Sequence, residues 1–270
     1  MKRRTMIACG IIALLFVLLI GRLIYFSIFK NGIYKRQVLS QQNYSSETLP
    51  YKRGDILDRD GNTLATSQKM YTLVLEPKNI LRSEEVQKST IDALHKYMKL
   101  DEDKLLKFIK RHKDSYYSVY REELSYSQIA DLKDFIASDK AENVSGIVFN
   151  EKYKRRYPNQ SLASQVIGFV SDGTIGTGGI EQYYNSTLSG VDGRKYKYLN
   201  EELEQDSSIV EPENGKTVVT TIDSNIQKLA EDQLSKFEKK YGSKGSSILV
   251  MNPNNGEIYA MANSPSYNLE

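Results

Sequence analysis

An apolar run from Met6 to about Phe29, interrupted only by Arg22, constrains this chain more than any other feature. The run is long enough to cross roughly 30 Å of hydrocarbon at about 1.5 Å per residue, so it predicts a transmembrane helix over residues 6–29. Arg22 lies toward the outer end of the run, where its long side chain reaches the membrane interface. The sequence therefore predicts a short tail, residues 1–5, followed by a single membrane anchor.

Basic residues near the N-terminus set the expected orientation of this anchor. Positions 2–4 are all basic, and no acidic residue occurs before residue 30. The positive-inside rule then places the N-terminus in the cytoplasm and the rest of the chain outside the membrane. A cleaved signal peptide is the alternative. Its apolar core is normally shorter and ends at a small-residue cleavage site, which is not evident between Gly21 and Gly32.

The basic character of the chain comes from the anchor region. The net charge is +3, and the basic residues in and before the apolar run account for it, because all 34 acidic residues come later. This balance gives no support for nucleic-acid binding. The only cysteine, Cys9, lies in the apolar run, so the remainder of the chain forms no internal disulfide. His95 and His112 lack companions at ligand spacing, so we expect no metal or other cofactor.

The segment from Arg53 to Ala65 has the pattern of a β-hairpin. Two short β runs flank an Asp60-Gly61 turn, and charges of both signs alternate along them. By turn chemistry alone this is an ordinary surface hairpin.

The same segment resembles a motif of class B penicillin-binding proteins, the monofunctional peptidoglycan transpeptidases of bacteria. The family pattern is close to R-G-x-I-x-D-R-N-G-x-x-L-A, with Asp60 here in place of the usual asparagine. Both residue types tolerate positive φ, so the exchange is conservative. The resemblance implies structural roles for five hairpin residues: Arg53, Gly54, Asp58, Arg59 and Gly61.

A second block begins in the densest basic cluster of the chain, residues 152–156. A basic cluster interleaved with tyrosine is also typical of sites for phosphate backbones or anionic lipid headgroups, which leaves a peripheral lipid-binding protein as an alternative. However, the segment Arg156-Tyr157-Pro158, followed by Ile-Gly-Phe at 167–169, resembles the R-x-Y-P and I-G-F elements of the same family. The arginines of the cluster are therefore expected to serve as ion-pair partners.

A third block, Gly178 to Tyr184, resembles the family pattern G-x-G-x-E-x-x-Y and contains Gly179 and Glu181. Segments that lie far apart in sequence need specific pairs to converge. A carboxylate at Glu181 would satisfy the guanidinium of Arg53 or Arg59, which is the pairing we expect. The alternative is that Glu181 is a solvated surface acid.

Periodicity predicts the elements between these blocks. A strand is expected at 71–75, followed by three helices that begin after Ser83, Asp101 and Ser125, and by a strand at 146–149. The helices form an insert over about residues 80–143, and their apolar stripes are those of an ordinary core.

Two further regions have clear patterns. Residues 31–50 are polar with Tyr34, Val38 and Leu39 at helical spacing, which predicts a helical stalk. From Lys216 the sequence predicts a strand at 218–222, a helix capped by Asp223, and two strands around a turn at 252–256. The expected inward face of that helix consists of five residues: Ile226, Leu229, Ala230, Gln233 and Phe237.

The sequence therefore predicts an α+β protein with a single N-terminal transmembrane helix. An elongated α+β pedestal of the penicillin-binding protein dimerisation type would follow at residues 30–210. Residues 211–270 would supply the first β-α-β-β elements of a transpeptidase domain, truncated at the end of the sequence.

The resemblance implies that the parent protein is a serine D,D-transpeptidase of the bacterial cell membrane. Such an enzyme cross-links peptidoglycan stem peptides in cell wall biogenesis and binds β-lactams. Its chemistry uses S-x-x-K, S-x-N and K-T-G elements together. This chain is interpreted as lacking that set, so no catalytic residue is assigned and the 270-residue chain is predicted to be inactive. The rival interpretation is a truncated, non-catalytic, membrane-anchored scaffold that binds a SEDS-type glycan polymerase or another cell-wall partner.

Overall fold

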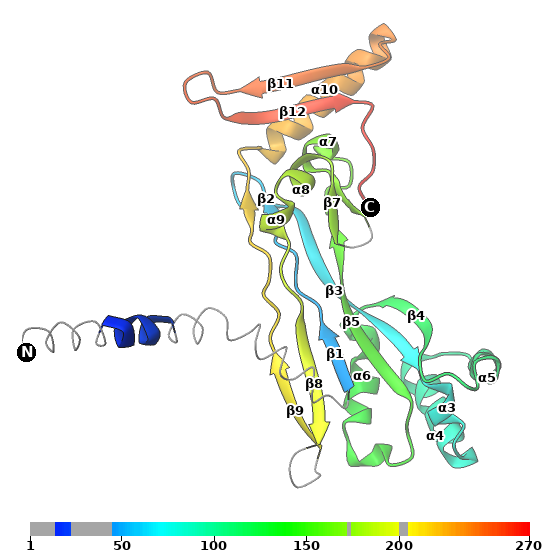
Figure 1. Cartoon of the computed structure of the whole chain (residues 1–270). Helices are drawn as coiled ribbons and strands as arrows, with labels where there is room; N and C mark the ends of the chain where they lie inside the picture. Colours follow the sequence, from blue (N-terminus) through cyan, green and yellow to red (C-terminus); the bar gives the residue numbers. More distant parts are fainter. Residues whose placement is uncertain (1–13, 23–44, 172–173, 200–204) are drawn as a thin grey trace, which may run out of the picture. The chain divides into compact units, whose positions relative to one another are not determined.

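A computed structural model of the chain describes residues 14–22, 45–171, 174–199 and 205–270 (Figure 1). Residues 14–22 are helical. In the part of the chain that the structure describes, no helix has both the length and the apolarity needed to span a bilayer. The expected anchor at residues 6–29 extends outside that part and stays a prediction. The remaining described residues form two compact units, which we describe separately.

The first unit contains a three-stranded antiparallel sheet in the order β1-β8-β9. Its strands are β1 (Ser45–Leu49), β8 (Gly193–Leu199) and β9 (Gln205–Val210). The prediction of a helical stalk is wrong for residues 45–49, and the rest of that stalk lies outside the described residues. Leu49 precedes Pro50, which disfavours the helical conformation, and pairing with β8 satisfies the strand's backbone groups instead.

The second unit is organised around β3 (Thr63–Leu75), which pairs along its length with β5 (Ile147–Arg156). The sheet order is β10-β2-β3-β4, and β5 pairs with β3 off this path. The expected hairpin is present: β2 (Ile56–Leu57) and β3 are antiparallel, and Gly61 in the turn has φ +86. The predicted strand at 71–75 is therefore the end of a longer strand that begins at the hairpin.

The helical insert contains the three helices expected from the sequence, α4 (Glu84–Met98), α5 (Glu102–Arg111) and α6 (Tyr126–Ile136). Their predicted caps are present at Ser83 and Asp101, each of which accepts a hydrogen bond from a backbone N–H of the first turn, and as a capping box at the start of α6. Three elements of this region were not predicted from the sequence: α3 (Pro77–Ile80), β4 (Ser118–Leu124) and the 3-10 helix η1 (Asp139–Ala141).

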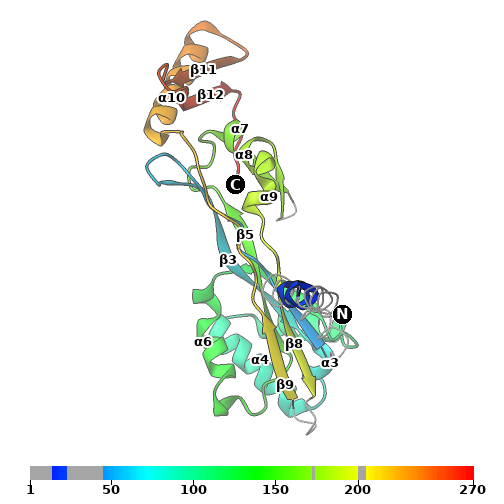
Figure 2. The same ribbon diagram turned by 60° about the vertical axis from the view of Figure 1, so that its left-hand side comes forward.

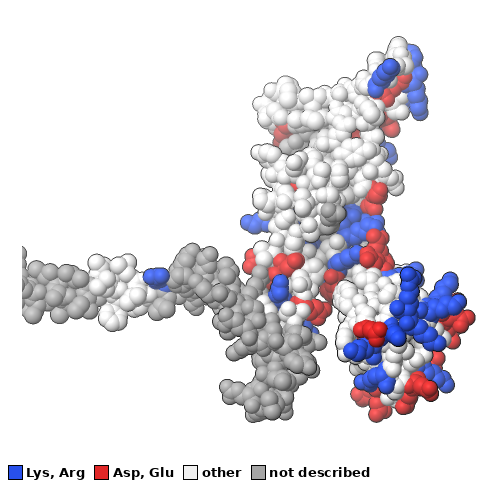
Figure 3. Space-filling model, turned by 45° about the vertical axis from the view of Figure 1, so that its right-hand side comes forward, with Lys and Arg blue, Asp and Glu red and all other residues white. Residues whose placement is uncertain are grey.

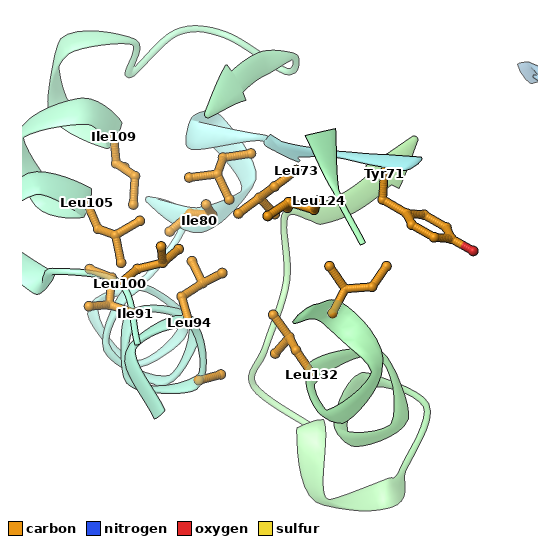
Figure 4. Close-up of a cluster of buried hydrophobic side chains, with 13 residues drawn as sticks. Tyr71, Leu73, Ile80, Ile91, Leu94, Leu100, Leu105, Ile109, Leu124 and Leu132 are labelled. Atoms are coloured by element: carbon orange, nitrogen blue, oxygen red, sulfur yellow. The ribbon is translucent and has the colours of Figure 1, made fainter. Parts of the chain in front are cut away.

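The insert packs against one face of the β3-β4-β5 sheet through a single apolar core (Figure 4). Leu94, Leu105 and Leu132 from the three helices are fully buried in it. Leu73 and Leu124 contribute from β3 and β4. The apolar stripes of the helices are thus core, as their periodicity predicted.

A group of short elements, which we call the head, follows β5. It consists of α7 (Ser164–Ile167), β6 (Phe169–Ser171), β7 (Ile175–Thr177), α8 (Gly179–Tyr183) and α9 (Asn185–Leu188). A second apolar core joins the head to the hairpin, with Ile56 and Leu64 packed beside Tyr157, Ile167 and Leu188. This core brings the three motif blocks of the sequence together.

The C-terminal elements are β10 (Val218–Val219), α10 (Ser224–Tyr241), β11 (Ser246–Met251) and β12 (Ile258–Ser264) (Figure 2). β10 is shorter than the predicted strand and pairs in parallel with β2. Asp223 caps α10 as expected. The antiparallel β11-β12 pair packs against one side of α10.

The predicted inward face of α10 is only partly correct. Ala230 is buried, whereas Leu229 is 59% and Phe237 is 49% exposed. Gln227 and Leu234 are buried in their place. The reason is geometric: two strands cover only a narrow stripe of a helix, so residues that flank this stripe stay in solvent.

Candidate functional site

A buried carboxylate lies where the hairpin meets the head. Glu181, in the first turn of α8, is fully buried, which excludes a solvated surface acid. Arg53 Nε donates to Glu181 Oε2 at 2.8 Å, and Arg53 Nη2 lies 2.8 Å from the same oxygen. Arg53 Nη2 also donates to the carbonyl oxygen of Glu181 at 3.0 Å. The expected contact between Glu181 and the hairpin is therefore made by Arg53.

The remaining nitrogen of Arg53 is also satisfied. Arg53 Nη1 donates to Ser189 Oγ at 2.8 Å, to Asn185 Oδ1 at 3.0 Å and to the carbonyl oxygen of Thr174 at 3.3 Å. These acceptors come from the residue just before β7, from α9 and from the residue just after α9. One arginine of the hairpin thus fixes the positions of several short head elements that have little core of their own.

A second arginine, Arg155 on β5, approaches Glu181 from the other side. Its Nε donates to Glu181 Oε1 at 2.7 Å, and its Nη1 donates to the carbonyl oxygen of Gly54 at 2.8 Å and to Ser67 Oγ at 3.1 Å. The hydroxyl of Tyr157 lies 3.5 Å from Glu181 Oε1. We call Arg53, Arg155, Glu181 and Tyr157 the ion network.

The ion network is shielded from water. The side chains of Arg53 and Arg155 are 4% and 5% exposed. Burial, followed by the Glu181 carboxylate, raises the pKa of Tyr157, so its hydroxyl stays protonated. Removing one partner of a buried ion pair leaves an uncompensated charge and costs about 3–5 kcal/mol. The network therefore holds the hairpin, β5 and the head together.

Two glycines permit the close approach of these segments. A Cβ on Gly176 would lie 2.0 Å from the carbonyl oxygen of Glu181 and 2.8 Å from Arg53 Nη2. A Cβ on Gly54 would lie 1.9 Å from the carbonyl oxygen of Lys216. A residue with a Cβ at either position would force the two contacting segments apart.

The opposite end of the hairpin contacts the start of α10 through Asp58, which is fully buried. Its Oδ1 accepts hydrogen bonds from the backbone N–H groups of Asp60 and Asn62, and its Oδ2 accepts from Asn62 Nδ2 and, at 2.6 Å, from Ser224 Oγ. Burial alone would raise the pKa of Asp58, but these hydrogen bonds outweigh it and lower the pKa to about 2. Asp58 is therefore ionised at neutral pH.

Backbone contacts continue this junction. The N–H of Arg59 donates to the carbonyl oxygen of Ile222, and the N–H of Thr220 donates to that of Leu57, both at 2.9 Å. The Arg59 guanidinium lies 4.4 Å from the ring centroid of Tyr259, in cation–π geometry. Arg59 is thus directed toward the C-terminal elements, and the alternative pairing of Arg59 with Glu181 does not occur.

The other residues singled out from the sequence have separate places. Gly61 forms the hairpin turn, and Gly179, with φ +50, begins α8 against the backbone of Val166. Pro158 is exposed just after β5. Arg156 Nη1 donates to Glu270 Oε2 at 2.8 Å instead of joining the ion network.

Tyr157 belongs to the R-x-Y-P element, whose spacing places the arginine at Arg155 and not at Arg156, whereas no motif indicated Asn185 or Ser189. Strand alternation could have indicated Arg155, because neighbouring residues on β5 point to opposite faces, so Arg155 and Arg156 cannot share a partner on one face. The expectation that the arginines of the basic cluster form ion pairs is confirmed for both.

The lysines of the basic cluster are also paired. Lys152 Nζ lies 2.7 Å from Glu122 Oε2, and Lys154 Nζ lies 2.6 Å from Glu123 Oε2. Figure 3 shows positive and negative side chains next to one another over the helical insert. This neutralisation disfavours a lipid-headgroup site at residues 152–156.

The described residues offer no metal centre. Among them, no group of three or more His, Cys, Asp or Glu side chains is placed to hold a metal ion. His95 Nδ1 and His112 Nδ1 are hydrogen-bonded to the carbonyl oxygens of Leu100 and Phe108. The site is thus a structural junction in which the charged groups pair with one another, although the buried Nη2 of Arg155 has no hydrogen-bond partner among the described residues.

By letters alone, two of the three catalytic elements do occur in the sequence. Residues 27–30 spell Ser-Ile-Phe-Lys and residues 266–268 spell Ser-Tyr-Asn, which match S-x-x-K and S-x-N by letters. The first lies at the end of the apolar run, outside the described residues. No K-T-G occurs, because Val218 follows Lys216 and Thr217. The set of three elements is therefore still incomplete in these 270 residues.

Comparison with known proteins agrees with this architecture. The family model of the penicillin-binding protein dimerisation domain matches residues 48–220. A structure of penicillin-binding protein 2X from Streptococcus thermophilus superimposes with a TM-score of 0.69 at 26% identity, over 84% of this chain and 36% of that chain. The chain therefore belongs to the penicillin-binding protein dimerisation-domain family.

Within this family, the chain is a homologue of the class B enzymes, as the motifs predicted. Stage V sporulation protein D of Bacillus subtilis (strain 168) is 29% identical, with 94% of this chain and 40% of the relative covered. The peptidoglycan D,D-transpeptidase FtsI of Escherichia coli (strain K12) is 25% identical, with 98% and 44% covered. The chain thus spans about two fifths of the length of these relatives.

A third similarity concerns a complex. The structure of penicillin-binding protein PBP2 with MreC from Helicobacter pylori matches with a TM-score of 0.57 at 25% identity, over 83% of this chain and 43% of that chain.

Proposed function

We propose that this chain is the anchor and pedestal of a class B penicillin-binding protein whose full length cross-links peptidoglycan stem peptides by serine acyl transfer. The observation that carries the proposal is the match of residues 48–220 to the dimerisation-domain family, together with relatives that are D,D-transpeptidases. In this proposal residues 30–210 form the pedestal, and residues 211–270 begin the transpeptidase domain. β-Lactams would acylate the same serine, which lies beyond Glu270.

The junction supports the role of a pedestal. The hairpin contacts the head through Arg53 and contacts the start of α10 through Asp58. A catalytic domain built onto β10 and α10 would therefore be held in a fixed position on the pedestal. We propose that the motif residues, from Arg53 to Glu181, serve this structural purpose.

The test is acylation by a fluorescent penicillin. The gene is first read past Glu270, and the longest open reading frame is expressed beside the 270-residue chain. We expect S-x-x-K, S-x-N and K-T-G in the longer protein, covalent labelling of that protein, and no labelling of the 270-residue chain. Labelling of the short chain, or a longer protein with all three motifs that does not react, would contradict the proposal.

The membrane anchor is part of this proposal. The apolar run at 6–29, with basic residues before it, supports a single pass with the N-terminus in the cytoplasm of a bacterial cell. Alkaline phosphatase fused after residue 50 should be active, whereas a fusion at residue 5 should be inactive. The opposite pattern, or release of the chain by alkaline carbonate, would contradict the topology.

A second candidate is a non-catalytic scaffold for a cell-wall partner. The Helicobacter pylori relative that was solved in complex with MreC supports this candidate, because it shows that a protein of this architecture binds another protein. A SEDS-type glycan polymerase is the other partner we propose to test. A genuine stop codon after Glu270, together with co-purification of either partner with the 270-residue chain, would favour the scaffold over the enzyme.

A further inference from the structure

The segment Pro265–Glu270, which we call the latch, returns from β12 to the head. Tyr267 donates its hydroxyl to the carbonyl oxygen of Ser164 at 3.0 Å, and Gln165 Nε2 donates to the carbonyl oxygen of Pro265 at 2.9 Å. Leu269 packs against the apolar core between hairpin and head. Figures 1 and 2 show the segment after β12 running past α7 before it reaches the C-terminus. Hydrogen bonds and an apolar contact therefore bind the latch to the head and its core at several points along its length.

The last contact of the latch is made by the Glu270 side chain. Its Oε1 accepts a hydrogen bond from the backbone N–H of Tyr157 at 2.7 Å, and its Oε2 accepts from Arg156 Nη1 at 2.8 Å. Burial opposes ionisation of Glu270, but these two donors outweigh it and lower its pKa. The Glu270 carboxylate thus accepts hydrogen bonds from two consecutive residues at the end of β5.

Tyr157 connects the latch to the ion network. Its backbone N–H contacts Glu270, while its ring is 3% exposed and its hydroxyl lies 3.5 Å from Glu181 Oε1. Arg155 and Tyr157 are two positions apart in sequence, and both contact Glu181. A displacement of the network would therefore shift the backbone group to which the latch is fastened.

We propose that Glu270 is a positioning residue, which couples the ion network of the pedestal to the segment that follows it in the full-length protein. The inference rests on the proposed function, because it assigns to that following segment the nucleophilic serine. Glu270 touches no reacting atom; it fixes where the chain leaves the pedestal, and thereby the path toward the catalytic residues.

An alternative is that the Glu270 contact is an ordinary surface ion pair. The side chains of Arg156 and Glu270 are 31% and 29% exposed, and pairs of this kind contribute little to global stability. A melting temperature alone cannot separate the two explanations. The chain offers a matched control on the same strand: Lys152 pairs with Glu122 of β4 at 2.7 Å instead of with the latch.

The first test measures amide exchange in the 270-residue chain. Glu270→Ala removes the acceptor of the Tyr157 N–H, and the loss of one hydrogen bond should speed exchange of that amide by about three- to tenfold. Lys152→Gln should leave it unchanged. Equal protection of the Tyr157 amide in the wild type and Glu270→Ala would overturn the latch contact.

The second test measures acylation of the full-length protein by a fluorescent penicillin. We expect Glu270→Gln to slow acylation by about threefold or more, on the scale of one partly exposed ion pair, with an unchanged melting temperature. Arg156→Lys, which keeps the charge, should restore most of the rate that Arg156→Gln loses, and Lys152→Gln should react like the wild type. A wild type that labels at the same rate as Glu270→Gln overturns the coupling. A wild type that does not label overturns the proposed function instead, and the coupling with it.

Discussion

The helical insert and the ion network are each stabilised internally, but by opposite kinds of interaction. The insert has a core of aliphatic side chains, among which Leu94, Leu105 and Leu132 are fully buried. The ion network places a carboxylate between two guanidinium groups, and its partners Arg53 and Glu181 are 128 residues apart. An apolar core tolerates many sequences of suitable volume, whereas a buried ion pair requires specific partners. The contrast explains why the network residues coincide with motifs and the insert residues do not.

The largest effect is expected from breaking the network. Glu181→Ala leaves two guanidinium groups without their carboxylate and should lower the free energy of unfolding by about 3–5 kcal/mol. Chemical denaturation of the purified chain measures it. The control is Glu231→Ala, on an acid that contacts the backbone of Ala163 without belonging to the network. A loss below about 1 kcal/mol for Glu181→Ala would contradict the role of the network.

A cavity in the insert core should have a smaller and more local effect. Leu94→Ala should destabilise by about 3 kcal/mol, in the lower half of the range for buried leucines. Amide exchange should increase in α4, α5 and α6, while the Tyr157 amide keeps its protection. If exchange rises equally at the junction, the two regions are one cooperative unit and the comparison fails.

Asp58 tests the junction through pH. Asp58→Asn keeps the shape but weakens hydrogen bonds to a charged acceptor, so we expect a loss of about 1–2 kcal/mol at neutral pH. The folded pKa of about 2 lies below the ordinary aspartate value of 3.8, so the contribution of the ionised form is present above about pH 4 and is lost as the pH falls toward 2. The difference between the two proteins should therefore shrink over that window. A constant difference would contradict the assignment.

The smallest effect is expected from the exposed pairs of β5. Lys152→Gln removes a pair whose side chains are 43% and 55% exposed, and should change stability by at most about 0.5 kcal/mol. The same denaturation experiment measures it. A loss comparable with that of Glu181→Ala would show that burial is not what distinguishes the network.

Local patterns in the sequence predicted local structure well. Caps at Ser83, Asp101 and Asp223 mark where helices begin, because each satisfies N–H groups within a few residues. β1 was missed because its partner β8 lies about 150 residues away. The exposed face of α10 was misassigned because periodicity does not reveal how many strands cover a helix.

The site was predictable only in part. The pairing of Glu181 with a hairpin arginine followed from the motifs, but its selection of Arg53 over Arg59 depends on tertiary geometry. Arg155 was missed because adjacent arginines on a strand look alike in sequence. The contact of Asp58 with Ser224 joins residues 166 positions apart, and no local pattern could indicate it.

A double-mutant cycle between Arg53 and Glu181 tests the central claim most directly. Arg53→Met, Glu181→Leu and the double variant are compared with the wild type by chemical denaturation. We predict that each single variant is strongly destabilised and that the double variant loses less than the sum of the two, with a coupling energy of about 2 kcal/mol or more. Recovery is incomplete because Arg155 still lacks its carboxylate in the double variant. Additive losses, with a coupling energy below about 0.5 kcal/mol, would contradict the claim that this buried pair joins the hairpin to the head.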